Sequence, residues 1–178
     1  GKTAGVDATT LEANAALRSI VRRDTKESYQ EFLTRLAKAS GIETPTREDL
    51  VRIDKNRKNK GSNKDWEHPH DPDAKITKMK DGRTHLAHKA EHAVDMETGA
   101  IMAVTLQPAN RGDTTSIAET IEQADKNLVA VMEDDRACKQ LSEQTLREVV
   151  ADKGYHSNAV LKAHRQRDIR TYISGPNR

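Results

Sequence analysis

Two aspartates stand out in the sequence because each lies in a short apolar segment typical of a β-strand. Asp7 follows Gly5-Val6, and Asp152 ends the run Val149-Val150-Ala151. If these strands are parallel neighbours, their carboxyl ends meet at one edge of a sheet, where ligands gather. Two close carboxylates repel each other, and divalent cations relieve that repulsion in a way that suits phosphoryl transfer. The other interpretation, which spacing alone favours, is that each aspartate only ends a strand or caps a turn.

Histidines form two further groups that could bind a metal. His85, His88 and His92 have helical metal-ligand spacing. On a strand, however, His88 and His92 share one face and His85 points away. The segment His68-Pro69-His70-Asp71 lies among polar residues typical of a turn. We therefore expect both groups to be surface residues rather than metal sites.

A basic run lies in the middle of the chain. It consists of Arg52, Lys55, Arg57, Lys58, Lys60 and Lys64, with Asp54 as its single acid. Such a run can bind DNA phosphates, and an ordinary solvated charge run explains the composition equally well. Trp66, beside the run, could stack on a base or anchor the segment on the rest of the fold.

Composition limits the classes of protein that fit. The 178 residues are 33% charged and 34% apolar, and the net charge is only +2, so any argument for nucleic acid must rest on local charge. The single cysteine, Cys138, excludes a disulfide framework and a Cys-rich zinc module and suits a reducing cytosol. No apolar run approaches the ~20 residues that a membrane span needs.

Hydrophobic periodicity predicts the elements that position these residues. Strands are expected at 4–11, 148–152 and 169–173, a hairpin at 85–95 and 100–106, and helices at 26–39, at 46–53, from 113 and from 157. A hairpin followed by alternating helices and strands predicts a mixed sheet with helices packed on it. We expect the centre of its core to consist of Ile101, Val104, Leu106, Val149 and Val150.

The middle of the chain differs from both ends. Residues 41–80 contain only eight apolar residues among forty, which is too little to offset the entropy of ordering. We therefore expect a long solvated insertion or linker. The chain then divides into residues 1–15, with the first strand and first acid; 16–83, a helical, basic and partly disordered insertion; and 84–178, with the hairpin, a helix, the strand with the second acid, a helix and a strand.

Several blocks of the sequence together resemble bacterial insertion-sequence transposases of the DDE type. Residues 5–15 (Gly-Val-Asp-Ala-Thr-Thr-Leu-Glu-Ala-Asn-Ala) are similar to the first catalytic motif of these enzymes, and residues 150–157 (Val-Ala-Asp-Lys-Gly-Tyr-His-Ser) to the second. Residues 71–75 and 89–95 resemble the segment that leads into the central hairpin. The blocks keep the order of the family through essentially the whole chain.

The resemblance implies an α/β fold: a ribonuclease H-like mixed sheet with flanking helices, interrupted after the first strand by a long helical and polar insertion. The first two acids of the family map onto Asp7 and Asp152, as catalytic residues and as ligands of Mg²⁺ or Mn²⁺. The third acid of the family is a Glu on a helix beyond the last strand. The sequence ends soon after Ile173, so we expect that Glu to lie outside it and this interior fragment to be inactive by itself.

Two functions follow from these observations. The first is DNA transposition by metal-dependent strand cleavage and strand transfer, with transposon ends and target DNA as partners. The alternative is a non-catalytic transposase remnant or DNA-binding piece that holds phosphates through the basic run. A bacterial, cytoplasmic, nucleoid-associated location without a membrane partner is expected for either. A homodimer of the full-length protein is left open.

Overall fold

The computed structural model describes residues 1–58, 60–140 and 146–175, which divide into two compact units. The sheet unit consists of Gly1–Leu11, Lys89–Gln107 and Arg111–Arg178, and the insertion unit consists of Glu12–His88 with Pro108–Asn110. Strands β1, β5 and β6 contribute residues to both units.

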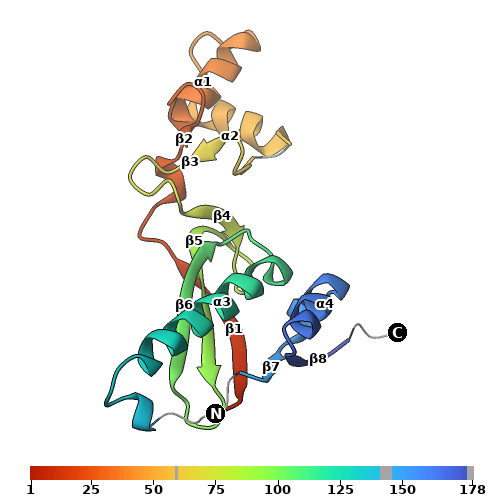
Figure 1. Cartoon of the computed structure of the whole chain (residues 1–178). Coiled ribbons are helices and arrows are strands. Elements are labelled where there is room, and N and C mark those ends of the chain that lie inside the picture. The colour runs from red at the N-terminus through yellow and green to blue at the C-terminus, as the bar shows by residue number, and fades with distance from the viewer. Residues whose placement is uncertain (59, 141–145, 176–178) are drawn as a thin grey trace. The chain divides into compact units, whose positions relative to one another are not determined.

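The main sheet has six strands. They are β1 (Thr3–Glu12), β4 (Lys75–Lys78), β5 (Thr84–Asp95), β6 (Ile101–Pro108), β7 (Glu148–Ala151) and β8 (Arg170–Ile173) (Figure 1). Their order is β4-β5-β1-β7-β8, and β6 also pairs with β5. Strand β7 is parallel to both β1 and β8, whereas β4 is antiparallel to β5. The expected mixed sheet with flanking helices is therefore confirmed, and it is compatible with a ribonuclease H-like fold.

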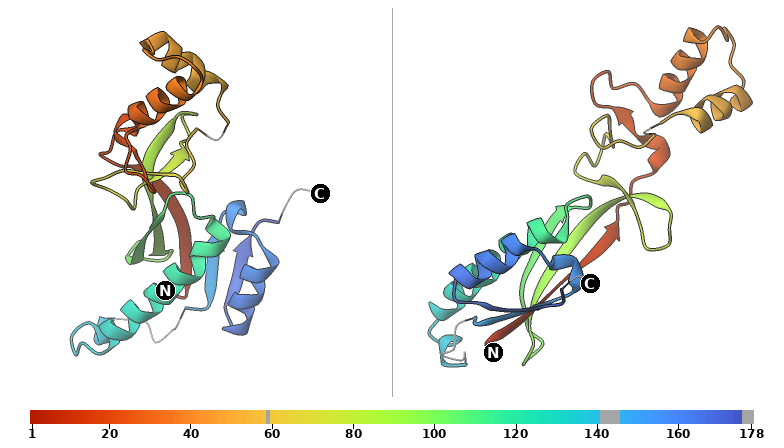
Figure 2. Two further views of the ribbon diagram at one scale, coloured as in Figure 1. Left: turned by 90° about the horizontal axis from the view of Figure 1, so that it is seen from above. Right: turned by 90° about the vertical axis from the view of Figure 1, so that its right-hand side faces the viewer.

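Two helices of the sheet unit pack on one face of this sheet (Figure 2). They are α3 (Asp113–Met132) and α4 (Asn158–Gln166), and the short 3-10 helices η2 (Cys138–Gln140) and η3 (Lys153–Tyr155) lie between them in the sequence. Ile117 and Ile121 of α3 are at most 1% exposed and join the core of the unit. Within the described ranges, every helix is too short or too polar to span a lipid bilayer.

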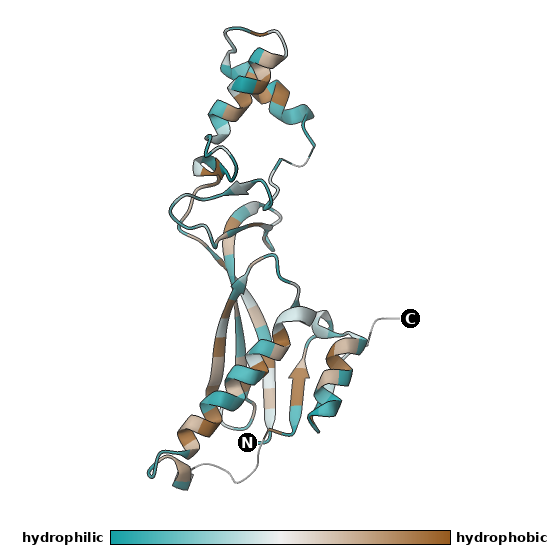
Figure 3. Ribbon diagram, turned by 45° about the horizontal axis from the view of Figure 1, so that its top comes forward, coloured by the Kyte–Doolittle hydropathy of each residue, from teal (hydrophilic) through white to brown (hydrophobic). Residues whose placement is uncertain are grey.

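The core of the sheet unit differs from the one predicted. Ile101, Val104 and Leu106 are 66%, 51% and 66% exposed, so their expected place at its centre was wrong. Val149 is fully buried as expected, and Val150 is half-buried. Val104 and Leu106 lie on the face of β6 away from α3, whereas Ala103 lies on the other face and shares a core with Ile117 and Ile121 of α3. Ile101 has the same orientation as Ala103 but lies at the exposed start of the strand. Figure 3 shows that α3 carries both apolar and polar residues along its length.

The insertion unit contains two helices and a short antiparallel ribbon. The helices are α1 (Tyr29–Ala39) and α2 (Arg47–Asn56), the ribbon is β2 (Val21–Arg22) with β3 (Trp66–Glu67), and a 3-10 helix, η1, spans Leu17–Ser19. Both helices begin with a capping box. In α1 the Ser28 hydroxyl accepts from the Glu31 amide, and in α2 Thr46 accepts from Asp49 in the same way. The two helices expected in this part of the chain are therefore confirmed.

Residues 41–80 do not form only the long solvated insertion or linker that the composition predicts, because three of them are buried in a core. Trp66, Ala74 and Ile76 are at most 8% exposed and form a core with Ile20 and Leu86. The Trp66 ring lies 5.0 Å from that of Tyr29 and 5.2 Å from that of Phe32, centroid to centroid. The few apolar residues of this segment suffice because most of their partners come from outside it. Trp66 therefore anchors the segment and does not present a free ring for a base.

Candidate active site

Asp7 lies within β1 and Asp152 directly follows β7, and these two strands are parallel neighbours, which the sequence left as a condition. In the pairing of β1 with β7, Val6 is opposite Ala151, and the next residue on each side is one of the two aspartates. Neighbouring strands are about 4.8 Å apart, so the two residues share one edge of the sheet. Both aspartates are exposed. The fold thus brings together two acids that are separated widely in the sequence.

Each carboxylate is held by a local backbone hydrogen bond. The Ala8 amide donates to Asp7 Oδ1 over 2.8 Å, and the Gly154 amide donates to Asp152 Oδ1 over 2.7 Å. Each side chain keeps further lone pairs for a cation. Two carboxylates fit Mg²⁺, which takes one or two protein carboxylates together with waters and substrate phosphate oxygens. The described residues assemble no group of three or more side chains that could hold a metal ion.

A hollow of about 570 Å³ opens on the sheet beside the two aspartates. It is lined by Gly5, Val6, Asp7, Thr9, His92, Val94, Met96, Val150, Ala151 and Asp152. A β-carbon at Gly5 would lie 2.5 Å from the Met96 sulfur, so a larger residue there would require the Met96 side chain to move. His92, expected as an exposed strand residue, is half-buried in the wall of this hollow.

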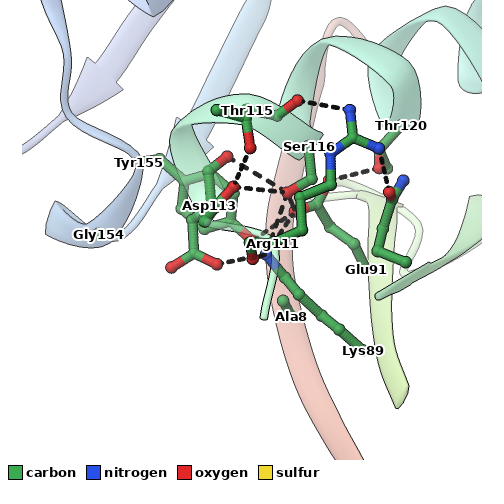
Figure 4. Close-up of polar contacts among 12 residues, drawn as sticks. Ala8, Lys89, Glu91, Arg111, Asp113, Thr115, Ser116, Thr120, Gly154 and Tyr155 are labelled. Carbon is green, nitrogen blue, oxygen red and sulfur yellow. Dashed lines mark hydrogen bonds and ion pairs between the residues drawn. The ribbon is translucent and has the colours of Figure 1, made fainter. Parts of the chain in front are cut away.

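A buried carboxylate lies on the opposite, helix-covered face of β5. Glu91 is 0% exposed, and the hydroxyls of Ser116 and Thr120 donate to its oxygens, Ser116 over 2.6 Å (Figure 4). The Tyr155 hydroxyl, from the turn after β7, also donates to Glu91 Oε1 over 3.1 Å. The burial of Tyr155 and the nearby Glu91 raise the pKa of this phenol, so it stays protonated and donates.

A buried lysine balances this carboxylate. Lys89 is 4% exposed, and its Nζ lies 3.6 Å from Glu91 Oε1. The same ammonium donates to Asp113 Oδ1 over 2.5 Å and to the Ser116 hydroxyl over 3.0 Å. Asp113 is the first residue of α3 and is partly exposed. Lys89, Glu91 and Asp113 therefore form one charged network against the N-terminal end of α3.

The sequence reasoning did not identify Lys89, Glu91 or Asp113 as functional candidates. Lys89 and Glu91 stand only in a block of family resemblance, and Asp113 stands only at the start of an expected helix. One signal could have found them: two oppositely charged residues at positions i and i+2 of a strand share one face. Alternation alone does not say which face of a strand is buried.

The remaining histidine candidates make pairwise polar contacts. His85 Nδ1 lies 2.5 Å from Glu12 Oε1, and His88 Nε2 lies 3.1 Å from Asp71 Oδ2. The contact with His88 is the main cause that lowers the pKa of Asp71. His68 is 7% exposed and stacks edge-on with His70. His70 is exposed as expected, whereas His68, His85, His88 and His92 are more buried than expected. Among the described residues, no three or more of these side chains and their acidic neighbours form a cluster that could hold a metal ion.

The basic run separates into engaged and free residues. Arg52 pairs with Asp49 over 2.7 Å. Arg57 pairs with Asp54 over 3.4 Å, and its guanidinium lies 4.7 Å from the centre of the Phe32 ring. The remaining four are exposed and have no ion-pair partner in the described part of the chain: Lys55, Lys58, Lys60 and Lys64. Asn59, within the run, lies outside the described residues.

Comparison with known families decides the identity of the fold. A family model described as "Transposase DDE domain" matches residues 63–177, well over half of the chain. The chain belongs to the DDE transposases. A search of curated proteins finds no match.

Membership among the DDE transposases confirms that the resemblance to a transposase of the DDE type is correct. The matched range includes Asp152 and all three residues of the buried charged network, whereas Asp7 lies before it. Transposases act on DNA, and this family generally uses divalent metal ions. The family therefore connects the chain with DNA transposition, while the roles of individual residues rest on the geometry described above.

Proposed function

We propose that Asp7 and Asp152 are catalytic residues of metal-dependent DNA strand cleavage and strand transfer, and that they hold Mg²⁺ or Mn²⁺. The observation that supports this proposal is the parallel pairing of β1 with β7, in which Val6 is opposite Ala151. Asp7 and Asp152 are therefore each one residue beyond a directly paired residue. The carboxyl ends of parallel strands are where α/β proteins bind their ligands.

The residues of this chain would contribute positioning and charge to the reaction. A bound divalent ion would supply charge stabilisation at the phosphate and a more acidic water or 3′-hydroxyl. Asp7 and Asp152 would orient that ion, because each carboxylate is restrained by an adjacent backbone amide. The hollow beside them, with Thr9 and His92 in its wall, offers room for a phosphodiester.

Manganese binding tests the proposed site directly. Electron paramagnetic resonance of free Mn²⁺ should show binding to the wild-type chain and losses of affinity of about tenfold or more in Asp7→Asn and in Asp152→Asn. Asp135→Asn is the matched control, since Asp135 is an exposed acid of the sheet unit outside the site. Equal affinity in all four proteins would place the metal elsewhere and remove support for the proposal.

A second candidate function is DNA binding without catalysis. The observation that favours it is the set of four exposed lysines at 55, 58, 60 and 64, which have no ion-pair partner in the described part of the chain. Exposed lysines bind phosphates by releasing counterions, largely without regard to base sequence. Binding that is sensitive to salt and unaffected by Asp7→Asn would support this function separately from the metal site.

A further inference from the structure

We propose that Glu91 and Tyr155 are positioning residues for Asp152: the buried carboxylate holds the tyrosine, and the tyrosine holds the turn that presents the aspartate. This inference rests on the proposed function, because it assigns Asp152 to the reaction. Neither residue would touch DNA or metal. Their effect would pass through the backbone between Ala151 and Tyr155.

The first link in this arrangement is the anchoring of Glu91 itself. Its carboxylate is completely buried and receives hydroxyl donors from Ser116 and Thr120, one helical turn apart on α3. Because two donors from one helix fix both carboxylate oxygens, the direction of the third bond, to Tyr155, is also fixed (Figure 4). Glu91 therefore offers the turn after β7 a rigid point of attachment.

The second link runs from Tyr155 to Asp152. Tyr155 is 1% exposed and lies in η3, for which Asp152 is the N-cap residue. The Tyr155 amide donates to the Asp152 carbonyl over 3.2 Å, and the Gly154 amide donates to the Asp152 side chain. Displacing the tyrosine would therefore displace the amide that orients the Asp152 carboxylate.

Lys89 supports the same turn from a second side. Its ammonium holds Asp113 Oδ1, and the other oxygen, Asp113 Oδ2, lies 2.7 Å from where a β-carbon on Gly154 would be. The turn is thus confined between a side chain held by Glu91 and a side chain held by Lys89. Both anchoring residues lie on the same face of β5.

Stability alone is a poor explanation for this network. Burying an ion pair costs desolvation that its attraction often fails to recover, and apolar residues of similar volume stabilise a core as well or better. Fully satisfied buried polar networks instead define one arrangement of the groups around them. A network that contacts the turn carrying Asp152 is placed where a defined arrangement would matter for the reaction.

The decisive comparison is between two tyrosine-to-phenylalanine variants of the full chain. Tyr155→Phe removes the bond to Glu91 and keeps the ring. Tyr29→Phe is the matched control, because the Tyr29 hydroxyl donates to Asp54 Oδ1 over 2.6 Å in the insertion unit. Each variant loses one tyrosine–carboxylate hydrogen bond. If the bond of Tyr155 contributed only to the overall stability of the chain, the two variants should have similar effects on the turn that carries Asp152.

Two readouts separate this inference from the proposed function. Hydrogen exchange of the Gly154 amide should become about tenfold faster in Tyr155→Phe and stay unchanged in Tyr29→Phe, which is a test without any metal. Unchanged exchange in Tyr155→Phe overturns the inference. Mn²⁺ affinity should fall about tenfold in Tyr155→Phe alone, as expected for a supporting residue behind a ligand. If exchange rises as expected but no variant alters Mn²⁺ binding, the positioning holds and the proposed metal site fails.

Glu91 variants provide a rescue test. Glu91→Gln keeps a side-chain oxygen for the Tyr155 hydroxyl, whereas Glu91→Ala removes it. We expect Gly154 exchange in Glu91→Gln to stay nearer to wild type than in Glu91→Ala. Equal exchange in the two variants, with both folded, would contradict the inference; if Glu91→Ala does not fold, the Tyr155→Phe result decides.

Discussion

Asp113 lies directly against Gly154: its Oδ2 atom is 2.7 Å from the position that a β-carbon on residue 154 would occupy. Asp152 Oδ1 lies 3.0 Å from the same position. Real β-carbons essentially never have a neighbour closer than 3.0 Å, so any larger residue requires a shift. Because Lys89 holds Asp113, the Asp113 carboxylate cannot simply turn away.

The first prediction follows from this contact. Gly154→Ala should lower the free energy of unfolding by about 1–3 kcal/mol, the usual cost of overpacking, and should weaken Mn²⁺ binding. Urea denaturation and the Mn²⁺ titration measure the two effects. Gly175→Ala is the control, since its β-carbon would meet only His156 Nε2, at an ordinary 3.8 Å. Equal stability and equal Mn²⁺ affinity of the two variants would show that the turn accommodates a β-carbon at residue 154 without cost.

The second prediction concerns the buried charges. Lys89→Met leaves the fully buried Glu91 without its compensating charge, which should cost about 3–5 kcal/mol in urea denaturation. The double variant Lys89→Met/Glu91→Gln removes both charges and should recover part of that loss. A coupling free energy near zero in this double-mutant cycle would show that the two side chains do not interact.

The site could be predicted only in part from the sequence. Asp7 and Asp152 are candidates from the sequence because an acid within or at the end of a short apolar strand is a local signal, and because both lie in blocks that resemble the catalytic motifs of the family. Lys89 and Glu91 gave no comparable signal, because a charged residue on a strand ordinarily faces water. The burial of Lys89 and Glu91 depends on α3 packing over β5, a long-range contact that brings Ser116 and Thr120 to the Glu91 carboxylate.

The hairpin shows the same limit for the fold. Strand bounds for β5 and β6 were predicted closely, but alternation does not state which face is inward. On β6 the apolar residues Val104 and Leu106 are exposed, while Thr105 and Gln107 are at most 9% exposed. Thr105 is buried because its hydroxyl bonds to that of Thr120 over 2.6 Å. The packing of α3 on the face that carries Ala103 and Thr105 therefore decides which face is inward, and this information is absent from the strand itself.

The third prediction tests this reversal of the core. Ile121 is fully buried and Leu106 is 66% exposed. Ile121→Ala should lower the free energy of unfolding by about 2–5 kcal/mol. Leu106→Ala should lower it by well under about 1 kcal/mol, because most of the Leu106 side chain is in contact with water and leaves no cavity when it is removed. Thermal or urea unfolding followed by circular dichroism measures both. A large loss of stability in Leu106→Ala would show that Leu106 belongs to the packed core.

The fourth prediction is a pH dependence in the insertion unit. Burial and the neighbouring Asp54 raise the pKa of Tyr29 to about 12, from an unfolded value of about 10. The neutral phenol therefore stabilises the folded state fully below about pH 10, and this contribution is lost as the pH rises towards 12. Fluorescence of Trp66, the only tryptophan, follows unfolding of this unit. The stability difference between wild type and Tyr29→Phe should shrink over that range, and a constant difference would contradict the assignment.

The last prediction concerns DNA and uses the division of the basic run into engaged and free residues. Each lysine that meets a phosphate should contribute about 0.9 to the slope of log affinity against log salt. Replacing Lys58, Lys60 and Lys64 together by alanine should therefore flatten that slope by nearly three units if all three touch phosphates. Arg57 is left in place because its pairing with Asp54 and its packing on Phe32 give it a structural role.

A matched triple variant makes this experiment specific. Lys38, Lys126 and Lys162 are also exposed, so replacing them changes the net charge by the same amount at other places on the chain. Fluorescence anisotropy with a duplex of arbitrary sequence, over a series of low salt concentrations, gives both slopes. A smaller slope only in the variant at 58, 60 and 64 supports phosphate contact through the basic run. Equal changes in the two variants would mean that DNA responds to total charge, and an unchanged slope in both would place the DNA contact on another surface.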